Sequence, residues 1–270
     1  METNEITETP PNQELVTTKL QNNIAIITLN RPEKRNAIND QMRADLCKAL
    51  EWAERSPSVR ALIITGAGKS FCSGGDISSM NERLAAPMGE VGINGWKRQR
   101  QTHKLVTRIH NIPKPTIAAV NGTATGLGCD IALCCDFIIG SSNAKFAMSY
   151  ILRGLIPDGG GMYFLPRRVG LAKAKELIFS GCVLTAEQAL EINMIEKKCD
   201  SEVLLAEAHS LAARMTVGSP EALALAKSIM ETSLESTMDE IFAKGSQAQA
   251  ICYTTDFHRQ SVKNFLNERT

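Results

Sequence analysis

Two glycine-containing turns, each following a short apolar and β-branched run, constrain this chain more than any other feature of its sequence. The first run, at 61–65, precedes a turn at 71–77, and the second, at 115–120, precedes a turn at 121–130. Runs of this length and composition predict short buried strands, and each turn predicts a connection into a helix. The sequence therefore predicts an α/β fold in which two turns can present main-chain N–H groups.

The pairing of these turns suggests two N–H donors that face one oxygen. Preorganised main-chain donors are the usual means of stabilising an oxygen that becomes negative during a reaction, especially at a helix N-terminus. A single turn would more simply be explained by the need for positive φ in a tight connection. Two nucleotide-binding interpretations fail, because Ile63 occupies the place of the first P-loop glycine and Ile131 that of the third dinucleotide glycine.

The chain divides into three predicted parts. Residues 1–13 are polar and lack an apolar face, which predicts a disordered arm. Residues 14–200 alternate strand-like and helix-like patterns and are expected to form the core domain, whereas 201–270 is predominantly helical and needs a partner surface. The predicted core elements are a hairpin at 15–20 and 24–29, a helix that begins at Asn39 or Asp40, helices at 96–110 and 126–135, and an extended segment at 137–140.

Composition excludes several classes of function. Lys and Arg number 30 against 29 Asp and Glu, so no overall field favours nucleic acid or an anionic membrane. No apolar run approaches a membrane span, and residues 1–14 lack the features of a signal or transit peptide, so we expect a cytoplasmic protein. The eight cysteines show no Cys-x-x-Cys pair, which predicts reduced thiols and no metal site.

The order and spacing of five segments resemble those of the enoyl-CoA hydratase/isomerase, or crotonase, family, from about Leu15 to Arg269. The segments are 29–38, the two glycine turns, 154–160 and 258–266. The resemblance implies a spiral core of repeated ββα units and a helical C-terminal segment that assembles trimers, often as dimers of trimers. It also implies an acyl-CoA thioester substrate, with coenzyme A carried by the substrate and no separate cofactor.

The resemblance assigns the two oxyanion donors to the main-chain N–H groups of Gly75 and Leu127. A thioester carbonyl acidifies the neighbouring carbon, and each such donor to the resulting enolate oxygen contributes roughly 3–4 kcal/mol. The family's CoA site maps onto the loop before the first helix and onto the first glycine turn. Its residues here are Arg35, Asn36, Ala37 and Ile38 along the coenzyme and Asp76 near the adenine.

The acid and base positions depart from the family's hydratases, which use two glutamates. Asp130 occupies the first position and Tyr150, expected to contact the substrate, occupies the second. Tyrosine is a poor base near neutrality, and Asp130 could instead cap the helix that follows the second turn. Asp158 is the third candidate. Although a turn role suits an aspartate between proline and glycine, family members that move a double bond often place a single acid here.

These observations favour an enzyme that shifts the double bond of an enoyl-CoA through an oxyanion-stabilised enolate, with Asp158 as the base. Asp130 then has a secondary catalytic role. A 2-enoyl-CoA hydratase and a catalytically weak acyl-CoA-binding protein are the alternatives. Residues 83–96, which include Pro87 and three glycines, are expected to form the mobile wall that selects the acyl group.

Overall fold

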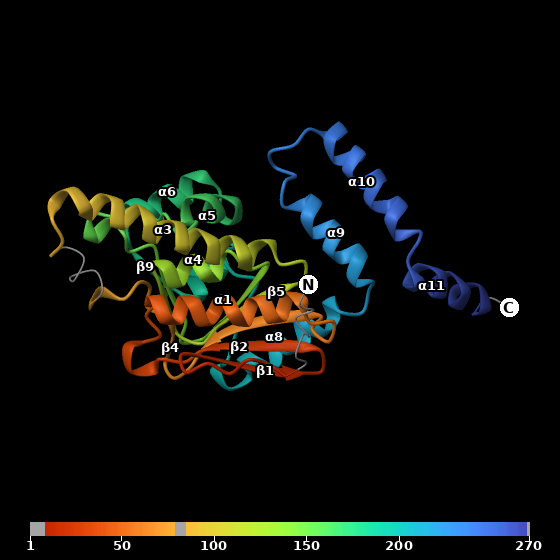
Figure 1. The fold of residues 1–270 in the computed structure, drawn as a ribbon, viewed down its shortest axis with the longest axis horizontal. Coiled ribbons are helices and arrows are strands. Elements are labelled where there is room, and N and C mark those ends of the chain that lie inside the picture. The colour runs from red at the N-terminus through yellow and green to blue at the C-terminus, as the bar shows by residue number, and fades with distance from the viewer. Residues whose placement is uncertain (1–8, 79–84, 269–270) are drawn as a thin grey trace, which may run out of the picture.

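The computed structural model describes residues 9–78 and 85–268 (Figure 1). Among them, six strands form the main sheet in the order β1-β2-β3-β5-β7-β10. β1 pairs antiparallel with β2, and the other neighbours run parallel. The strands are β1 (Val16–Gln21), β2 (Ile24–Leu29), β3 (Ala61–Gly66), β5 (Thr116–Val120), β7 (Phe137–Ser141) and β10 (Lys197–Cys199).

A smaller second sheet lies beside the first and has the order β4-β6-β8-β9. Three of its strands each follow a main-sheet strand along the chain, which produces the repeated ββα unit that the family resemblance implies. The chain passes from the main sheet to the small sheet at Gly122. The backbone here lies so close to that of Lys69 that a Cβ on Gly122 would be 2.0 Å from the Lys69 carbonyl oxygen. The strands are β4 (Ser70–Cys72), β6 (Thr123–Thr125), β8 (Lys145–Ala147) and β9 (Val183–Thr185).

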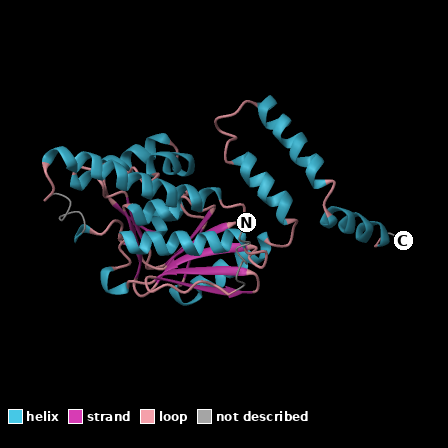
Figure 2. Ribbon diagram, viewed as in Figure 1, coloured by secondary structure: helices cyan, strands magenta, loops and turns pink. Residues whose placement is uncertain are grey.

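Helices cover both faces of the main sheet (Figure 2). Alternate strand residues face opposite ways, so Leu62 and Ile64 join the larger core cluster, whereas Ala61 and Ile63 pack with α8. The helices are α1 (Asp40–Arg55), α3 (Met88–Asn111), α4 (Leu127–Leu133), α5 (Gly161–Val169), α6 (Leu171–Ser180), α7 (Ala186–Glu191), α8 (Leu204–Met215), α9 (Pro220–Met230), α10 (Met238–Cys252) and α11 (Asp256–Asn267). No helix within 9–78 and 85–268 is long and apolar enough to cross a membrane.

The predicted core elements are present, with some shifted ends. The hairpin is confirmed, and the helix expected at Asn39 or Asp40 is α1, whose cap is Asn39: its Oδ1 accepts from the Met42 N–H at 2.8 Å. α3 begins at Met88, eight residues before the predicted start, so most of the expected wall at 83–96 is helical. Residues 83 and 84 lie outside the described part. All eight cysteines are free thiols, four of them buried.

The two ends of the chain differ from the predicted division. In the arm 1–13, residues 1–8 lie outside the described part, while the Gln13 N–H donates to the Val16 carbonyl oxygen at 3.0 Å. At the other end, α8 belongs with the core, because Leu204, Ala208 and Ala212 are buried against the main sheet. The helices that extend away from the sheets are therefore α9, α10 and α11, none of which has a buried residue.

The loop at 31–38 is fixed by a buried asparagine. Asn36 has φ of +56° and a side chain with no exposed surface. Its Oδ1 accepts from the Arg31 N–H at 2.8 Å, and its Nδ2 donates to the carbonyl oxygens of Ala67 at 2.9 Å and Ser70 at 2.7 Å. Asparagine suits this position because it adopts the left-handed conformation and supplies both donor and acceptor. The loop is thereby tied to the strand that precedes the first glycine turn.

Replacing Asn36 should separate its hydrogen bonds from its backbone conformation. We expect Asn36→Gly to lower the free energy of unfolding by about 3 kcal/mol through three lost hydrogen bonds. Asn36→Ala should cost roughly 1 kcal/mol more, because alanine resists positive φ. Urea denaturation followed by circular dichroism measures both values. Losses within about 0.5 kcal/mol for both variants, as for ordinary surface substitutions, would contradict this account of the loop.

Candidate active site

Four residues that the sequence singled out line one small pocket. Its volume is about 100 Å³, and it lies between the two glycine turns, the segment after β8 and α3. The four are Gly75, Leu127, Tyr150 and Asp158, and the remaining lining residues are Arg98, Gln99, Thr102, Leu155 and Ile156. The fold thus brings together residues from widely separated parts of the chain.

The two glycine turns touch through their main chains. β4 and β6 pair in parallel, so the turns leave the same end of the small sheet. A Cβ at Gly74, where φ is +98°, would lie 2.8 Å from the Thr125 carbonyl oxygen, and one at Gly128 would lie 2.1 Å from the Cys72 carbonyl oxygen. Only glycine permits this approach.

The contact places two unused donors at the pocket. Leu127 is the first residue of α4, so its N–H has no acceptor within the helix. In the parallel bridge between Ile38 and Gly75, the hydrogen bonds use the N–H groups of Ile38 and Asp76. Among the described residues, the N–H groups of Gly75 and Leu127 donate to no protein acceptor. Both remain available to a substrate oxygen.

Asp130 is buried behind the pocket rather than in its lining. Its Oδ2 accepts a hydrogen bond from the Tyr150 hydroxyl, and its side chain has no exposed surface. Burial raises the pKa of Asp130 to about 7, the Tyr150 hydrogen bond opposes the rise, and the nearby Asp158 charge adds to it. The Gly161 N–H also lowers this pKa, although Oδ1 accepts no hydrogen bond of normal geometry from the described residues.

The expectation that Asp130 caps its helix is wrong. The N-cap of α4 is Gly126, which makes no side-chain cap, and Asp130 lies in the first turn with its carboxyl turned to Tyr150. Two glycines make room for that carboxyl. A Cβ at Gly159 would lie 2.3 Å from Asp130 Oδ2, and one at Gly161 would lie 2.7 Å from Oδ1.

Tyr150 acts as a donor to Asp130 and not as a base. Burial raises its pKa well above the ordinary value, and the Asp130 charge raises it further. The Tyr150 hydroxyl therefore keeps its proton at pH values near neutrality.

Asp158 is the half-buried carboxyl that lines the pocket itself. Burial raises its pKa, whereas the positive charges of His103 and Arg98 on α3 lower it. The Asp158 carbonyl oxygen accepts from His103 Nε2 at 3.0 Å, and its N–H donates to the Ile156 carbonyl oxygen at 2.8 Å. The His103 contact holds the main chain of Asp158 against α3.

The residues predicted to bind coenzyme A surround the same turns but differ in exposure. Arg35 is exposed, whereas Ala37 and Ile38 are buried, at 8% and 2% exposed. The Asp76 carboxylate accepts from the Ser78 hydroxyl at 2.6 Å and from Arg31 Nη1 at 2.5 Å. These partners lower its pKa to about 2, against the effect of burial. Asp76 therefore has a structural role that its predicted place near the adenine did not indicate.

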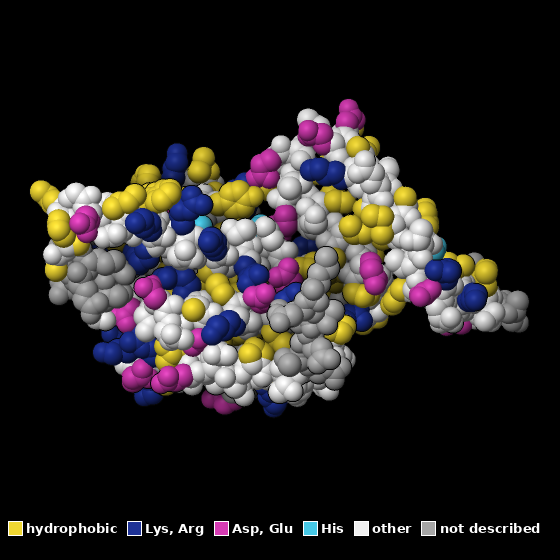
Figure 3. Space-filling model, viewed as in Figure 1, with side chains coloured by type: hydrophobic (Ala, Val, Ile, Leu, Met, Phe, Trp, Pro, Cys, Tyr) yellow, Lys and Arg dark blue, Asp and Glu magenta, His cyan; other side chains and the backbone are white. Residues whose placement is uncertain are grey.

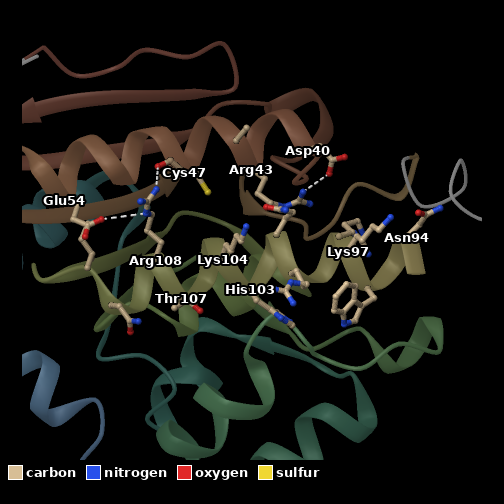
Figure 4. Close-up of a pocket in the computed structure, with 17 residues that line it drawn as sticks. Asp40, Arg43, Cys47, Glu54, Asn94, Lys97, His103, Lys104, Thr107 and Arg108 are labelled. Carbon is tan, nitrogen blue, oxygen red and sulfur yellow. Dashed lines mark hydrogen bonds and ion pairs between the residues drawn. The ribbon is translucent and has the colours of Figure 1, made fainter. Parts of the chain in front are cut away.

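A larger cationic groove lies between α1 and α3 (Figure 4) and was not predicted. Its volume is about 1,460 Å³, and it shares Arg98 with the small pocket. In the groove, Arg43 pairs with Asp40, and Arg108 pairs with Glu54. The spacing of the basic residues on α3 was the available signal, but a charged stripe on a helix is usually just solvated. The lining cations are Arg43, Lys97, Arg98, Arg100, Lys104 and Arg108.

Comparison with known proteins identifies close relatives over nearly the whole chain. A family model described as enoyl-CoA hydratase/isomerase matches residues 19–270. The chain is 37% identical to a 1,2-epoxyphenylacetyl-CoA isomerase of Escherichia coli K12, over 95% of this chain and 97% of the other. It is 34% identical to a crotonyl-CoA hydratase of Syntrophomonas wolfei, over 91% and 92%. A solved enoyl-CoA hydratase/isomerase from Cupriavidus metallidurans CH34 superposes with a TM-score of 0.88 at 31% identity, over 96% and 95%.

The raised pKa of Asp130 predicts that stability depends on pH. Because this pKa is about 7 in the folded protein and ordinarily 3.8, the folded state binds more protons between those values. The contribution of Asp130 to the free energy of unfolding therefore falls as pH rises from about 4 to 7. We expect Asp130→Asn, compared with the unsubstituted protein, to gain on the order of 3 kcal/mol between pH 4 and pH 8.

Urea denaturation at the two pH values and equal protein concentration measures this gain. Asp200→Asn is the matched control, because Asp200 is exposed and makes no cap hydrogen bond where η3 (Ser201–Val203) begins. A pH-independent difference for Asp130→Asn would show that the carboxyl does not titrate abnormally.

Proposed function

Because the chain belongs to the enoyl-CoA hydratase/isomerase family, we propose that it moves the double bond of an enoyl-CoA thioester, with Asp158 carrying the proton. One observation carries the proposal: Asp158 lines the same pocket as the two free N–H groups, whereas Asp130 does not. A thioester oxygen between the N–H groups of Gly75 and Leu127 would place the neighbouring acyl carbons beside Asp158.

The proposed reaction needs one base and no net change in protons. The Asp158 carboxylate takes a proton from C2 of a 3-enoyl-CoA, or from C4 of a 2-enoyl-CoA in the reverse direction, and the electrons of the broken C–H bond are delocalised onto the thioester oxygen. The resulting dienolate is stabilised by the two N–H groups, each worth roughly 3–4 kcal/mol. The protonated Asp158 then returns the proton to the other carbon. Burial raises the pKa of Asp158, which strengthens it as a base.

Hydration is the second candidate, and one observation favours it. Asp130 and Tyr150 form a hydrogen-bonded pair at the two positions where the resemblance places the hydratase acids, and the pKa of Asp130 is about 7. A general base works best with a pKa near the operating pH. Against it, Asp130 is shielded from the pocket by Tyr150, which itself stays protonated. A catalytically weak acyl-CoA-binding protein is the third possibility, and turnover distinguishes it from the other two.

The remaining expectations stay predictions. Coenzyme A would follow the loop at 31–38, where Lys34 and Arg35 are exposed cations. The absence of a further cofactor and a cytoplasmic location rest on the sequence alone. For the C-terminal helices we propose assembly into a homotrimer or a dimer of trimers, because their apolar side chains are exposed (Figure 3).

Asparagine substitutions test which carboxyl carries the proton. We expect Asp158→Asn to slow isomerisation of a 3-enoyl-CoA by roughly 10²–10⁴-fold, the contribution of a positioned general acid–base group. Binding of a saturated acyl-CoA should persist, because the side chain keeps its size. Asp130→Asn should cost less, since the amide oxygen can still accept from Tyr150.

Both variants are assayed with 2-enoyl and 3-enoyl substrates. A severe loss at Asp130 with near-normal rates at Asp158, together with water addition to the 2-enoyl substrate, would establish the hydratase instead. Binding without turnover of either substrate would establish the acyl-CoA-binding protein.

Light scattering tests the proposed assembly. We expect a mass of about 88 kDa, three times the 29.4 kDa of one chain, or a multiple of it. Phe242→Asp places a charge on the exposed apolar surface of α10, where Phe242 is 61% exposed, and should lower the mass. Phe179→Asp on α6 is the matched control and should leave it unchanged. A monomeric unsubstituted protein would refute the assembly.

A further inference from the structure

Asp130 is a buried acid that the proposed proton transfer does not use. Its carboxyl has no exposed surface and does not line the pocket. Main chain encloses it on one side, because a Cβ would lie 2.3 Å from Oδ2 at Gly159 and 2.7 Å from Oδ1 at Gly161. Among the described residues, Oδ2 has the Tyr150 hydroxyl as its donor, and Oδ1 has no hydrogen bond of normal geometry. An oxygen in this state would accept a hydrogen bond from water if water could reach it.

Tyr150 lies between this carboxyl and the pocket. Its half-buried side chain lines the pocket, while its hydroxyl donates to Asp130. The ring lies over the second glycine turn, where a Cβ at Gly126 would be 3.8 Å from ring atoms Cε2 and Cζ. The Tyr150 carbonyl oxygen accepts from the N–H groups of Arg153 at 2.9 Å and Leu155 at 3.1 Å, which fixes its main chain. One well-held side chain thus separates Asp130 from the pocket.

The proposed reaction makes the exclusion of water necessary. Moving the double bond of a 3-enoyl thioester leaves a 2-enoyl thioester, whose C3 can be attacked by water. That addition places the hydroxyl of the water on C3 and a proton on C2, so a base must take a proton from the water. Burial raises the pKa of Asp130 to about 7, which suits a general base near neutrality. The chain therefore holds a suitable base for hydration directly behind Tyr150.

We propose that Tyr150 determines the outcome of the reaction by keeping water away from Asp130. Its ring occupies the space between the carboxyl and the pocket, and its hydroxyl takes the carboxyl oxygen to which an incoming water would bind. Tyr150 is thus a specificity-determining residue that acts through Asp130, and the site yields the isomer instead of a 3-hydroxyacyl thioester. The inference rests on the proposed function, since it requires that a 2-enoyl thioester forms in this pocket.

The products formed from 3-hexenoyl-CoA in water labelled with ¹⁸O test the proposal. We expect the unsubstituted protein to form 2-hexenoyl-CoA with little labelled 3-hydroxyhexanoyl-CoA, as measured by mass spectrometry. Tyr150→Ala opens a path for water to Asp130 and should raise the ratio of hydration to isomerisation at least about tenfold. This value lies below the roughly 10²–10⁴-fold effect of a well-positioned base. Tyr150→Leu, which keeps more of the apolar volume, is measured in parallel.

Three further variants separate this role from a purely structural one. Tyr150→Phe keeps the ring and should leave the ratio low. Tyr150→Ala combined with Asp130→Asn admits water but removes the base, so the ratio should return to its low value. Ile156→Ala widens the pocket at another wall and should leave the ratio unchanged even where the overall rate changes. If the bond between Tyr150 and Asp130 served stability alone, its loss would lower both products together.

The titration of Asp130 provides a measurement that needs no turnover. Asp130→Asn is expected to gain stability relative to its parent between pH 4 and pH 8, because burial raises the pKa of the carboxyl. In a Tyr150→Ala background, water would hydrate the carboxylate and lower its pKa, so urea denaturation should show less than half of this gain. If water stays out, loss of the hydroxyl donor would instead raise the pKa and increase the gain.

Three results would overturn the proposal. The first is hydration by the unsubstituted protein as fast as isomerisation, which requires no variant to fold. The second is a ratio within about twofold of the parent in folded Tyr150→Ala and Tyr150→Leu enzymes. The third is an equal rise with and without Asp130→Asn, which would assign the water to another base. An unsubstituted protein that isomerises no 3-enoyl-CoA refutes the proposed function alone, and the stability gain in the Tyr150→Ala background then decides whether Tyr150 excludes water.

Discussion

The main-chain contact between the two glycine turns is the constraint on which the site depends. Gly74 and Gly128 face carbonyl oxygens of the other turn at distances that no Cβ atom could occupy. Parallel pairing of β4 with β6 brings the turns together, and the start of α4 then leaves the Leu127 N–H unused beside that of Gly75. The proposed oxyanion site is therefore a property of the backbone, and its two N–H groups are in place before any substrate binds.

The two acidic side chains of the site differ in burial, and burial determines how readily each one ionises. Asp130 has lost all contact with solvent and depends on Tyr150 for its hydrogen bond, which makes it a costly group to ionise. Asp158 is only half-buried and lies under the positive charges of His103 and Arg98. The more accessible carboxyl is thus also the one that ionises more readily. Environment, more than residue type, distinguishes the two.

Local signals in the sequence predicted much of the fold, and contacts between distant segments account for what they missed. Asn39 is itself the cap of α1, and the strands of the main sheet have a recognisable apolar pattern. These elements were therefore predictable from the sequence. The strands of the small sheet have three residues each, too few to show a period. α8 has an ordinary amphipathic pattern, which does not reveal that its partner is the main sheet. Arg98 was missed because only the folded chain places that part of α3 opposite the glycine turns.

The glycines beside Asp130 couple three positions of the chain in evolution. A side chain at 159 would begin 2.3 Å from one carboxyl oxygen of Asp130, and one at 161 would begin 2.7 Å from the other. A lineage could therefore accept a larger residue at either position only after position 130 had lost its acid or the segment after β8 had moved. We therefore expect Asp130, Gly159 and Gly161 to vary together among related chains. A chain should either keep all three residues or have replaced the acid before either glycine.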